Sequence, residues 1–161
     1  MATGYPSTDT QKMAWKLALK NACIKLICER IANIEQAMHE ARESANSEEK
    51  SSAGDKYETS RAMGHLAQEM QSKQLEDAKQ DLDAINRLNA TGLHTSAVTG
   101  AVVMCSDIIF YLSLGLGTTE IDGHKVTLLS PKAPIAVLLH QKKAGDTFVF
   151  NKKTMEILDI F

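Results

Sequence analysis

Two carboxylates stand three residues apart near the middle of the chain, at Asp55 and Glu58. Residues three apart on a helix project from the same side, so both could act on one ligand. Carboxylate oxygens are the ligands that Mg²⁺ prefers. The same spacing also fits a capping box, in which Asp55 accepts a backbone N–H and Glu58 reaches back to the cap. Both interpretations stay open, because a cap occupies only one carboxylate oxygen. Glu48 and Glu49 lie in the same polar segment and could substitute for the pair.

Two segments with helical apolar spacing flank this polar stretch. The first carries a seven-residue repeat with a second set three positions later, at Leu17, Ile24, Ile31, Met38 and Ala45 and at Ile27, Ile34 and Ala41. The second carries Met63, Leu66, Met70, Ala78, Leu82, Ile85 and Leu88. Two such helices can bury their apolar faces against each other. The pattern therefore predicts a long antiparallel coiled-coil hairpin over residues 1–91, capped at Ser7, Thr8 or Asp9, with its tip near residues 43–58.

Residues 92–161 have a different composition, rich in β-branched and aromatic side chains with glycine turns. Asp122-Gly123 and the run 151–153 predict tight hairpin turns. Pro134 suits the first turn of a short helix, which Leu138 and Leu139 should bury. In the last run, Met155 and Ile157 alternate out of phase with Leu158 and Ile160, which indicates a bulge. The whole chain thus predicts an α+β protein whose second domain, residues 92–161, is a small antiparallel sheet with one short helix.

Composition narrows the class of protein. The 161 residues are 24% charged and 43% hydrophobic with a net charge of −2, so no strong general attraction for nucleic acid is expected. Cys23, Cys28 and Cys105 are expected as small core residues in a reducing compartment. No signal-peptide pattern or membrane-length apolar run occurs, which favours the cytoplasm. Neither a zinc-ligand cluster nor a nucleotide-binding loop stands out, so no cofactor of its own is expected.

Two stretches resemble the Gre family of bacterial transcript-cleavage factors. Residues 54–85 resemble the tip and second helix of that family, where Gly-Asp is followed three residues after the Asp by Glu, as at Asp55 and Glu58. Residues 129–150, LSPKAPIAVLLHQKKAGDTFVF, resemble the family's Ser-Pro-Ile-Ala, apolar turn and Lys-x-x-Gly-Asp. The chain departs from the pattern at Ala133, which replaces a Ser, at residues 59–62, which replace Asn-Ala-Glu-Tyr, and in a longer tip between Arg42 and Gly54.

The resemblance implies a divergent Gre-type factor with an FKBP-like second domain. Such a factor is a monomer that binds RNA polymerase through its secondary channel and reaches the 3′ end of backtracked RNA. It is not itself an enzyme, because it stimulates the polymerase's own RNA cleavage. Asp55 would help to hold the polymerase's Mg²⁺, and Glu58 would orient the metal or the attacking water. Contacts to RNA or polymerase would come first from cations near the tip, Arg42, Lys50, Lys56 and Arg61, with Lys16, Lys20 and Arg30 as further candidates.

Three other functions remain open. A homologue with an altered tip could occupy the channel and regulate or inhibit without cleavage. An FKBP-like isomerase or chaperone would need a pocket lined with aromatic side chains, and the second half offers only Phe110, Tyr111, Phe148, Phe150 and Phe161. A coiled-coil adaptor would need the hairpin alone. Trp15, near the start of the first helix, is expected to pack against the second domain and not to bind a ligand.

Overall fold

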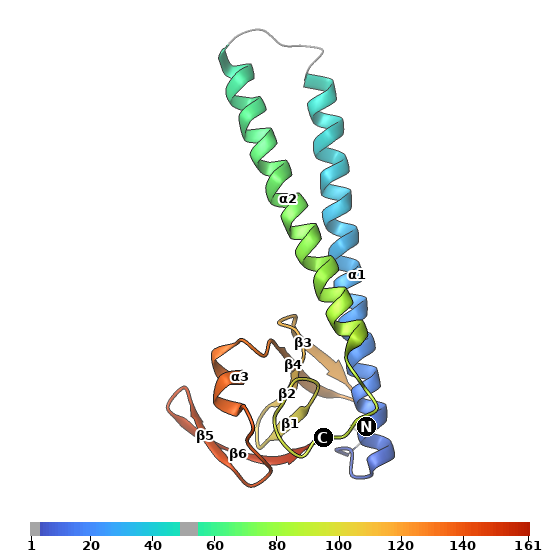
Figure 1. Cartoon of the computed structure of the whole chain (residues 1–161), viewed down its shortest axis with the longest axis vertical. Helices are drawn as coiled ribbons and strands as arrows, with labels where there is room; N and C mark the ends of the chain where they lie inside the picture. The colour runs from blue at the N-terminus through green and yellow to red at the C-terminus, as the bar shows by residue number, and fades with distance from the viewer. Residues whose placement is uncertain (1–3, 49–54) are drawn as a thin grey trace. The chain divides into compact units, whose positions relative to one another are not determined.

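The computed structural model describes residues 4–48 and 55–161 and has the predicted α+β class (Figure 1). Two long helices come first, α1 (Asp9–Glu48) and α2 (Asp55–Arg87). A mixed sheet and one short helix follow, formed by β1 (Val102–Cys105), β2 (Ile109–Leu112), β3 (Gly117–Ile121), β4 (His124–Leu129), α3 (Pro134–Leu139), β5 (Thr147–Phe150) and β6 (Lys153–Ile160). In the described part of the chain, no helix is long and apolar enough to cross a membrane.

The chain separates into two compact units. The sheet unit comprises residues up to Lys25 together with Ile85–Phe161, and the hairpin unit comprises Leu26–Ala84. Both long helices therefore contribute to both units. The boundary near residue 91 that composition predicts marks a change in sequence character, and it stays a prediction.

The start of α1 is fixed by a capping box. The backbone N–H of Gln11 donates to Oγ1 of Thr8 at 3.2 Å, and Oε1 of Gln11 accepts the backbone N–H of Thr8 at 3.1 Å. Of the three predicted caps, Thr8 thus takes the role, and α1 begins at the next residue, Asp9.

The sheet has the strand order β3-β4-β2-β1-β6-β5. Four of its neighbouring pairs are antiparallel, but β2 and β4 are parallel, so the prediction of a wholly antiparallel sheet is wrong. The reason is that the chain passes from β2 to the edge of the sheet, where it forms β3, and then turns back in the β3–β4 hairpin. The returning strand β4 then lies between β3 and β2 and runs in the direction of β2.

The predicted turns and the bulge are confirmed. Asp122 and Gly123 have φ of 50° and 81°, and Asn151 and Lys152 have φ of 50° and 64°, which is the twist that two-residue hairpins favour. In the pairing of β1 with β6, Met104 lies opposite Asp159 and Cys105 opposite Ile157, so the residue between them on β6 is unpaired. That extra residue, Leu158, explains the change of phase in the apolar pattern of the last strand.

The middle of the sheet is buried on both faces. One face belongs to a core that α3 covers, with Val103, Cys105, Phe110, Leu112, Phe148, Met155 and Ile157 among its members. The side chains that alternate with these on β1, β2 and β4 are also buried, at Val102, Met104, Ile109, Tyr111, Val126 and Leu128. In α3, Ile135, Ala136 and Leu139 are buried. Leu138 is 48% exposed, so its predicted burial is wrong, because a single short helix turns only one side toward a sheet.

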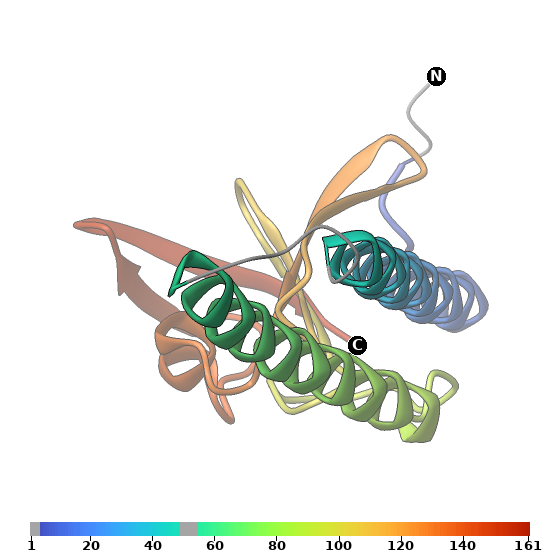
Figure 2. The same cartoon turned by 90° about the horizontal axis from the view of Figure 1, so that it is seen from above.

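In the hairpin unit, α1 and α2 run side by side in opposite directions (Figures 1 and 2). The burial predicted for much of the coiled-coil seam is wrong. Met63, Leu66 and Met70 are 64%, 52% and 58% exposed. In the sheet unit Leu17, another predicted seam residue, is 50% exposed. Ile27 and Ala78 are buried as predicted. A regular coiled coil needs large apolar residues at successive facing positions, and the facing residues toward the far end of these helices are small or polar.

Candidate functional site

The predicted carboxylate pair falls in the first turn of α2. The helix begins at Asp55, whose side chain lies outside the described residues, and the side chain of Glu58 is exposed to solvent. Lys50 and Glu49 also lie outside the described residues. The partial positive charge of a helix N-terminus stabilises a carboxylate in the first turn, whether that carboxylate caps the helix or binds a cation. The geometry therefore leaves both interpretations of the pair open.

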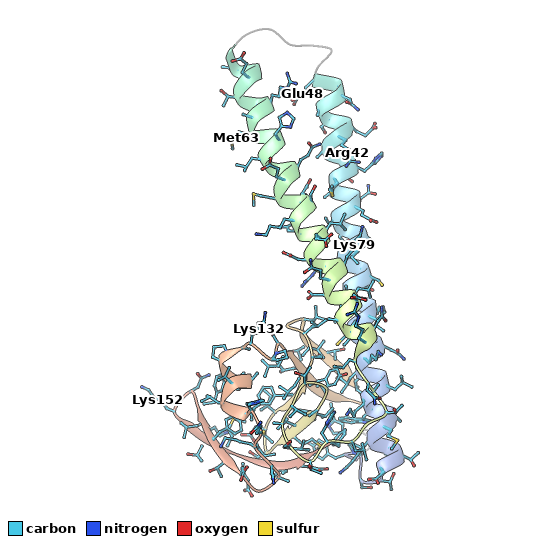
Figure 3. All side chains as sticks on the ribbon, viewed as in Figure 1. Arg42, Glu48, Met63, Lys79, Lys132 and Lys152 are labelled. Atoms are coloured by element: carbon cyan, nitrogen blue, oxygen red, sulfur yellow. The ribbon has the colours of Figure 1, made fainter. Side chains whose placement is uncertain are left out.

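The other predicted contact residues near this end of the helices are exposed. They are Arg42 in α1 and Lys56 and Arg61 in α2, and Arg42 and Glu48 are labelled in Figure 3. An exposed guanidinium or ammonium group is free to move and can meet a phosphate or a carboxylate of a partner. All three cations are therefore accessible, and their contact with RNA or polymerase stays a prediction.

A groove of about 410 Å³ lies between the last turns of α1 and the first turns of α2. It is lined by Ala41, Ser44, Ala45, Glu48, Ser60, Arg61, Gly64, His65, Ala67 and Gln68. Most of these side chains are small, so the two helices leave space between them. An added Cβ at Gly64 would meet no atom within 4 Å. The sequence pattern missed this groove, although the run of small residues at facing positions was its signal.

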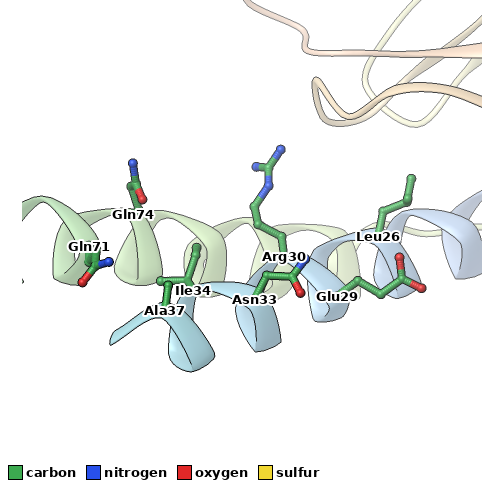
Figure 4. Close-up of a pocket in the computed structure, with 8 residues that line it drawn as sticks. All are labelled: Leu26, Glu29, Arg30, Asn33, Ile34, Ala37, Gln71 and Gln74. Atoms are coloured by element: carbon green, nitrogen blue, oxygen red, sulfur yellow. The ribbon is translucent and has the colours of Figure 1, made fainter. Parts of the chain in front are cut away.

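A second, shallower hollow of about 430 Å³ lies further along the same two helices (Figure 4). Arg30, Asn33, Gln71 and Gln74 give it a polar lining. Arg30 approaches the carboxylate of Asp81 at 3.9 Å, a distance that permits only a weak ion pair. Oε1 of Gln71 has no hydrogen-bond partner among the described residues. These amide and guanidinium groups could bind a polar ligand, but among the described residues no three His, Cys, Asp or Glu side chains gather to hold a metal ion.

Two lysines predicted as candidate RNA or polymerase contacts make hydrogen bonds within the sheet unit. Lys16 is fully buried and donates to the carbonyl of Gly92, and burial lowers its pKa to about 8. Lys20 donates to the carbonyls of Asn86 and Leu88, both at 2.8 Å. The prediction that Lys16 reaches a partner is wrong, because its side chain is fully buried. Lys20 is only partly buried and donates to carbonyls at the end of α2 that the helix itself cannot satisfy, and its contact with a partner stays a prediction.

Lys16 also acts on a nearby histidine. Burial lowers the pKa of His94, and the ammonium group of Lys16 lowers it further by like-charge repulsion. The sequence could not indicate this pair, because Lys16 and His94 stand 78 positions apart and only the fold brings them together. Both groups bind protons less tightly in the folded protein than in the unfolded chain. Their charged forms therefore destabilise this part of the sheet unit.

The cysteines take two different environments. Cys23 and Cys105 are buried, and burial raises the pKa of both thiols, that of Cys105 to about 11. Sγ of Cys23 lies 3.8 Å from Oγ of Ser113. Cys28 is exposed, so its prediction as a core residue is wrong. It stands five residues after Cys23 on α1, and five residues carry a helix well past one turn, to a different side.

The start of α1 packs on the sheet through polar as well as apolar contacts. Nε1 of Trp15 donates to Oδ2 of Asp122 at 2.8 Å, in the turn between β3 and β4. The ring of His124 stacks on Tyr5 at 4.5 Å between centroids. Nζ of Lys12 lies 2.6 Å from Oδ2 of Asp159. Trp15 is 5% exposed, which confirms the predicted packing role.

The aromatic side chains of the second half serve mainly as core. Phe110, Tyr111, Phe148 and Phe161 are buried, and Phe150 packs against the core that α3 covers. The hydroxyl of Tyr111 has no hydrogen-bond partner among the described residues, and burial raises the pKa of this phenol. Side chains that fill a core cannot also line an open ligand pocket, which weakens the case for an isomerase.

No protein family, no curated protein and no solved structure matches this chain in comparisons of its sequence and fold.

Proposed function

We propose that the protein is a Gre-type transcription factor that enters the secondary channel of bacterial RNA polymerase and stimulates cleavage of backtracked RNA. The observation that carries the proposal is the pair Asp55 and Glu58 in the first turn of a 33-residue helix that runs antiparallel to a second long helix. A helix of that length extends about 50 Å at 1.5 Å per residue. A carboxylate at its start can therefore be carried deep into a narrow channel of a partner.

The proposed role of the pair is to complete a metal site that the polymerase itself holds only weakly. Hydrolysis of a phosphodiester by two metal ions needs one ion to activate water and one to stabilise the leaving oxygen. Mg²⁺ keeps several of its waters and needs only one or two carboxylates from protein. Asp55 would bind the second Mg²⁺, and Glu58 would orient that ion or the attacking water. The polymerase remains the enzyme, and the factor needs no cofactor of its own.

The cations near the tip support the same proposal. Arg42, Lys56 and Arg61 are exposed, and each can pair with a phosphate of the RNA 3′ end or an acidic group of the channel wall. The charged side chains of the hairpin unit are mostly negative, so this unit would not bind nucleic acid in general. The few cations next to the acidic pair would instead orient the tip.

For the sheet unit we propose the FKBP-like docking domain of such a factor, bound at the rim of the polymerase channel. The support is the six-stranded mixed sheet with α3 packed on one face. The stretch 129–150, which contains α3, also resembles the corresponding motif of the family. The factor would act as a monomer in the cytoplasm.

A factor that occupies the channel and inhibits is the second candidate. The observation that favours it is Arg61, which lies where the family has an acidic residue and which lines the groove beside Glu48. A cation this close to the acidic pair would compete with Mg²⁺ for the carboxylates. Cleavage and occupancy therefore have to be measured separately.

The test uses a stalled and backtracked elongation complex supplied with Mg²⁺ and the full-length protein. We expect short 3′ RNA products to form faster with the protein than without it, and Asp55→Ala to lose the effect while it still binds polymerase. Glu35→Ala removes an exposed carboxylate elsewhere on the hairpin unit and serves as the matched control. Binding without cleavage by the wild type would favour the inhibitor, and no binding would exclude both functions.

A further inference from the structure

One edge of the sheet offers backbone groups for pairing with a further strand. The strand β5 ends the strand order and, in the described part of the chain, pairs only with β6 (Figure 1). A two-residue turn joins the two strands, so Phe150 and Lys153 beside the turn exchange hydrogen bonds. Because such pairs alternate along an antiparallel ladder, Phe148 also directs its backbone groups toward β6. The backbone groups of Thr147 and Val149 therefore point away from β6, toward the open edge.

The side chains along this edge leave it accessible. Val149 is 61% exposed, and Thr147 is exposed as well. Asp146 and Lys152, which flank the strand, are also exposed, and Figure 3 labels Lys152 at the hairpin turn. An accessible edge with unused N–H and C=O groups can pair with a strand of another chain.

A second copy of β5 fits this edge in one register. When two identical strands pair antiparallel about a two-fold axis, each contact occurs twice. With Val149 opposite Val149 of the second copy, the outward backbone groups of both strands can exchange hydrogen bonds. The same register places Asp146 opposite Lys152 of the second copy at both ends of the contact. Opposite charges at facing positions stabilise a pair of strands.

Other registers lose this match of charges. When the second copy slides by two residues, Asp146 faces the apolar Phe150 in place of a cation. When it slides by two more, Lys152 faces Lys142, and like charges at facing positions destabilise a pair of strands. A slide in the other direction places Lys152 opposite Phe148. Charge therefore favours the register centred on the middle of the strand.

The remaining charges of the β5–β6 hairpin are compatible with this pairing. Lys153 forms an ion pair with Asp107, and Glu156 belongs to β6, one strand away from the edge. Lys143 precedes Asp146 by three residues and lies beyond the turn of the second copy. None of these groups comes to face a like charge across the contact.

The other edge of the sheet lacks this complementarity. It is formed by β3, which carries Glu120 and no cation between Gly117 and Ile121. Two copies of β3 would thus bring together carboxylates without a facing lysine or arginine in the strand. The comparison singles out β5 as the edge that fits a second copy.

We propose that two copies of the free protein pair through β5 into a two-fold symmetric dimer in which one sheet continues across both copies. A stable dimer buries about 800 Å² on each partner, and a strand of four residues supplies only part of that area. We therefore expect a weak dimer with a Kd of about 100 µM. The proposal does not rest on the proposed function, since a weak dimer releases the monomer on dilution.

Sedimentation velocity of the full-length protein tests the proposal, at concentrations from about one tenth of that Kd to about ten times it. We expect the wild type to pass from monomer to dimer over this range. Lys152→Asp should weaken the dimer roughly 10-fold or more, because two carboxylates then face each other. Aspartate tolerates the left-handed backbone at this position, where φ is 64°, so the turn is kept. Glu120→Lys reverses a charge on the β3 edge and is the matched control, which should dimerise as the wild type does.

Mixing two variants tests the register itself. Asp146→Lys alone should also weaken the dimer, because two lysines then face each other. An equimolar mixture of Asp146→Lys and Lys152→Asp should dimerise as the wild type does, because every facing pair in the mixed dimer again joins a lysine and an aspartate. A disturbed fold in either variant could not produce this recovery.

Three results would overturn the proposal. The first is a wild-type protein that stays monomeric over the whole concentration range. The second is a dimer that Lys152→Asp leaves unchanged, because the contact would then lie elsewhere. The third is a mixture that stays monomeric while both variants are folded, as circular dichroism would show, because the two charges would then not face each other.

Discussion

Replacing the buried Lys16 by Met should stabilise the protein at neutral pH, and the gain should disappear at high pH. Burial lowers the pKa of this ammonium group from 10.5 to about 8, which corresponds to about 3 kcal/mol at 1.4 kcal/mol per pKa unit. The hydrogen bond to the carbonyl of Gly92 offsets part of that cost, by about 1 kcal/mol. We therefore expect Lys16→Met to raise the free energy of unfolding by about 1–2 kcal/mol at pH 7.

The sign of the pH dependence follows from the direction of the pKa change. Below pH 8 both the folded and the unfolded protein keep the proton of Lys16, so the folded protein carries the full desolvation cost. Between pH 8 and 10.5 the unfolded chain binds more protons, and stability from this group rises with pH. Above 10.5 neither state is charged, and the cost is gone. The difference in stability between Lys16→Met and wild type should thus shrink across that window.

Urea unfolding at pH 7, 8.5 and 10 measures this difference, and taking it between variants cancels the titration of other groups. Lys79→Met, at an exposed position of α2 that Figure 3 labels, is the control and should show no pH-dependent difference. A Lys16→Met difference that stays constant from pH 7 to 10 would refute the argument, because the ammonium group would then be hydrated in the folded protein.

Further predictions concern single contacts. Thr8→Ala should lower the free energy of unfolding by about 1 kcal/mol through loss of the capping box, measured by urea unfolding, and equal stability would show that the cap is not needed. Tyr111→Phe should raise it by about 1–2 kcal/mol, because a buried hydroxyl without a partner among the described residues is removed; a loss of stability would mean that the hydroxyl is satisfied. Leu139→Ala should lower it by about 2–5 kcal/mol, since this side chain at the end of α3 is fully buried in the core, and a change below 1 kcal/mol would argue against that packing. In the native protein a thiol reagent should modify Cys28 much faster than Cys23 and Cys105, as mass spectrometry of the labelled peptides would show, and equal rates would contradict the assigned burial.

The local features of the fold were predictable because they depend on few neighbours. The cap at Thr8, the turn at Asp122-Gly123 and the bulge at Leu158 each follow from residue types within a short stretch. The parallel pairing of β2 with β4 was not predictable in this way. It depends on which strand of the β3–β4 hairpin pairs with β2, and no short sequence pattern indicates that β4 does so.

The apolar seam was predicted only in part because periodicity shows which residues share a side, not which side faces a partner. Ile27 is buried and Leu17 is half exposed, although the same repeat contains both. The residues actually buried near the start of α1 include Leu19 and Cys23, four apart, and Cys23 contacts Ser113, which directly follows β2. A helix that packs on a sheet buries a stripe with a period of 3.6, and a strict seven-residue repeat drifts away from it.

The candidate site was likewise predictable only in part. Residue type and spacing made Asp55 and Glu58 the candidate pair, and the first turn of α2 contains both. Spacing could not separate Lys16, which the fold buries, from Lys56 and Arg61, which stay exposed. Charged residues on a predicted helix become distinguishable only when the helix has neighbours, and the groove is likewise a property of the folded pair of helices.

The most direct test of the central claim is the Mg²⁺ dependence of RNA cleavage in a backtracked polymerase complex. A carboxylate that helps to hold the second metal ion should lower the Mg²⁺ concentration needed for half-maximal cleavage, by roughly 10- to 100-fold. We predict that the wild-type protein produces this change and that Asp55→Ala does not. If the wild-type protein saturates the polymerase and the Mg²⁺ dependence of cleavage is the same with and without it, the proposed role of the acidic pair is wrong.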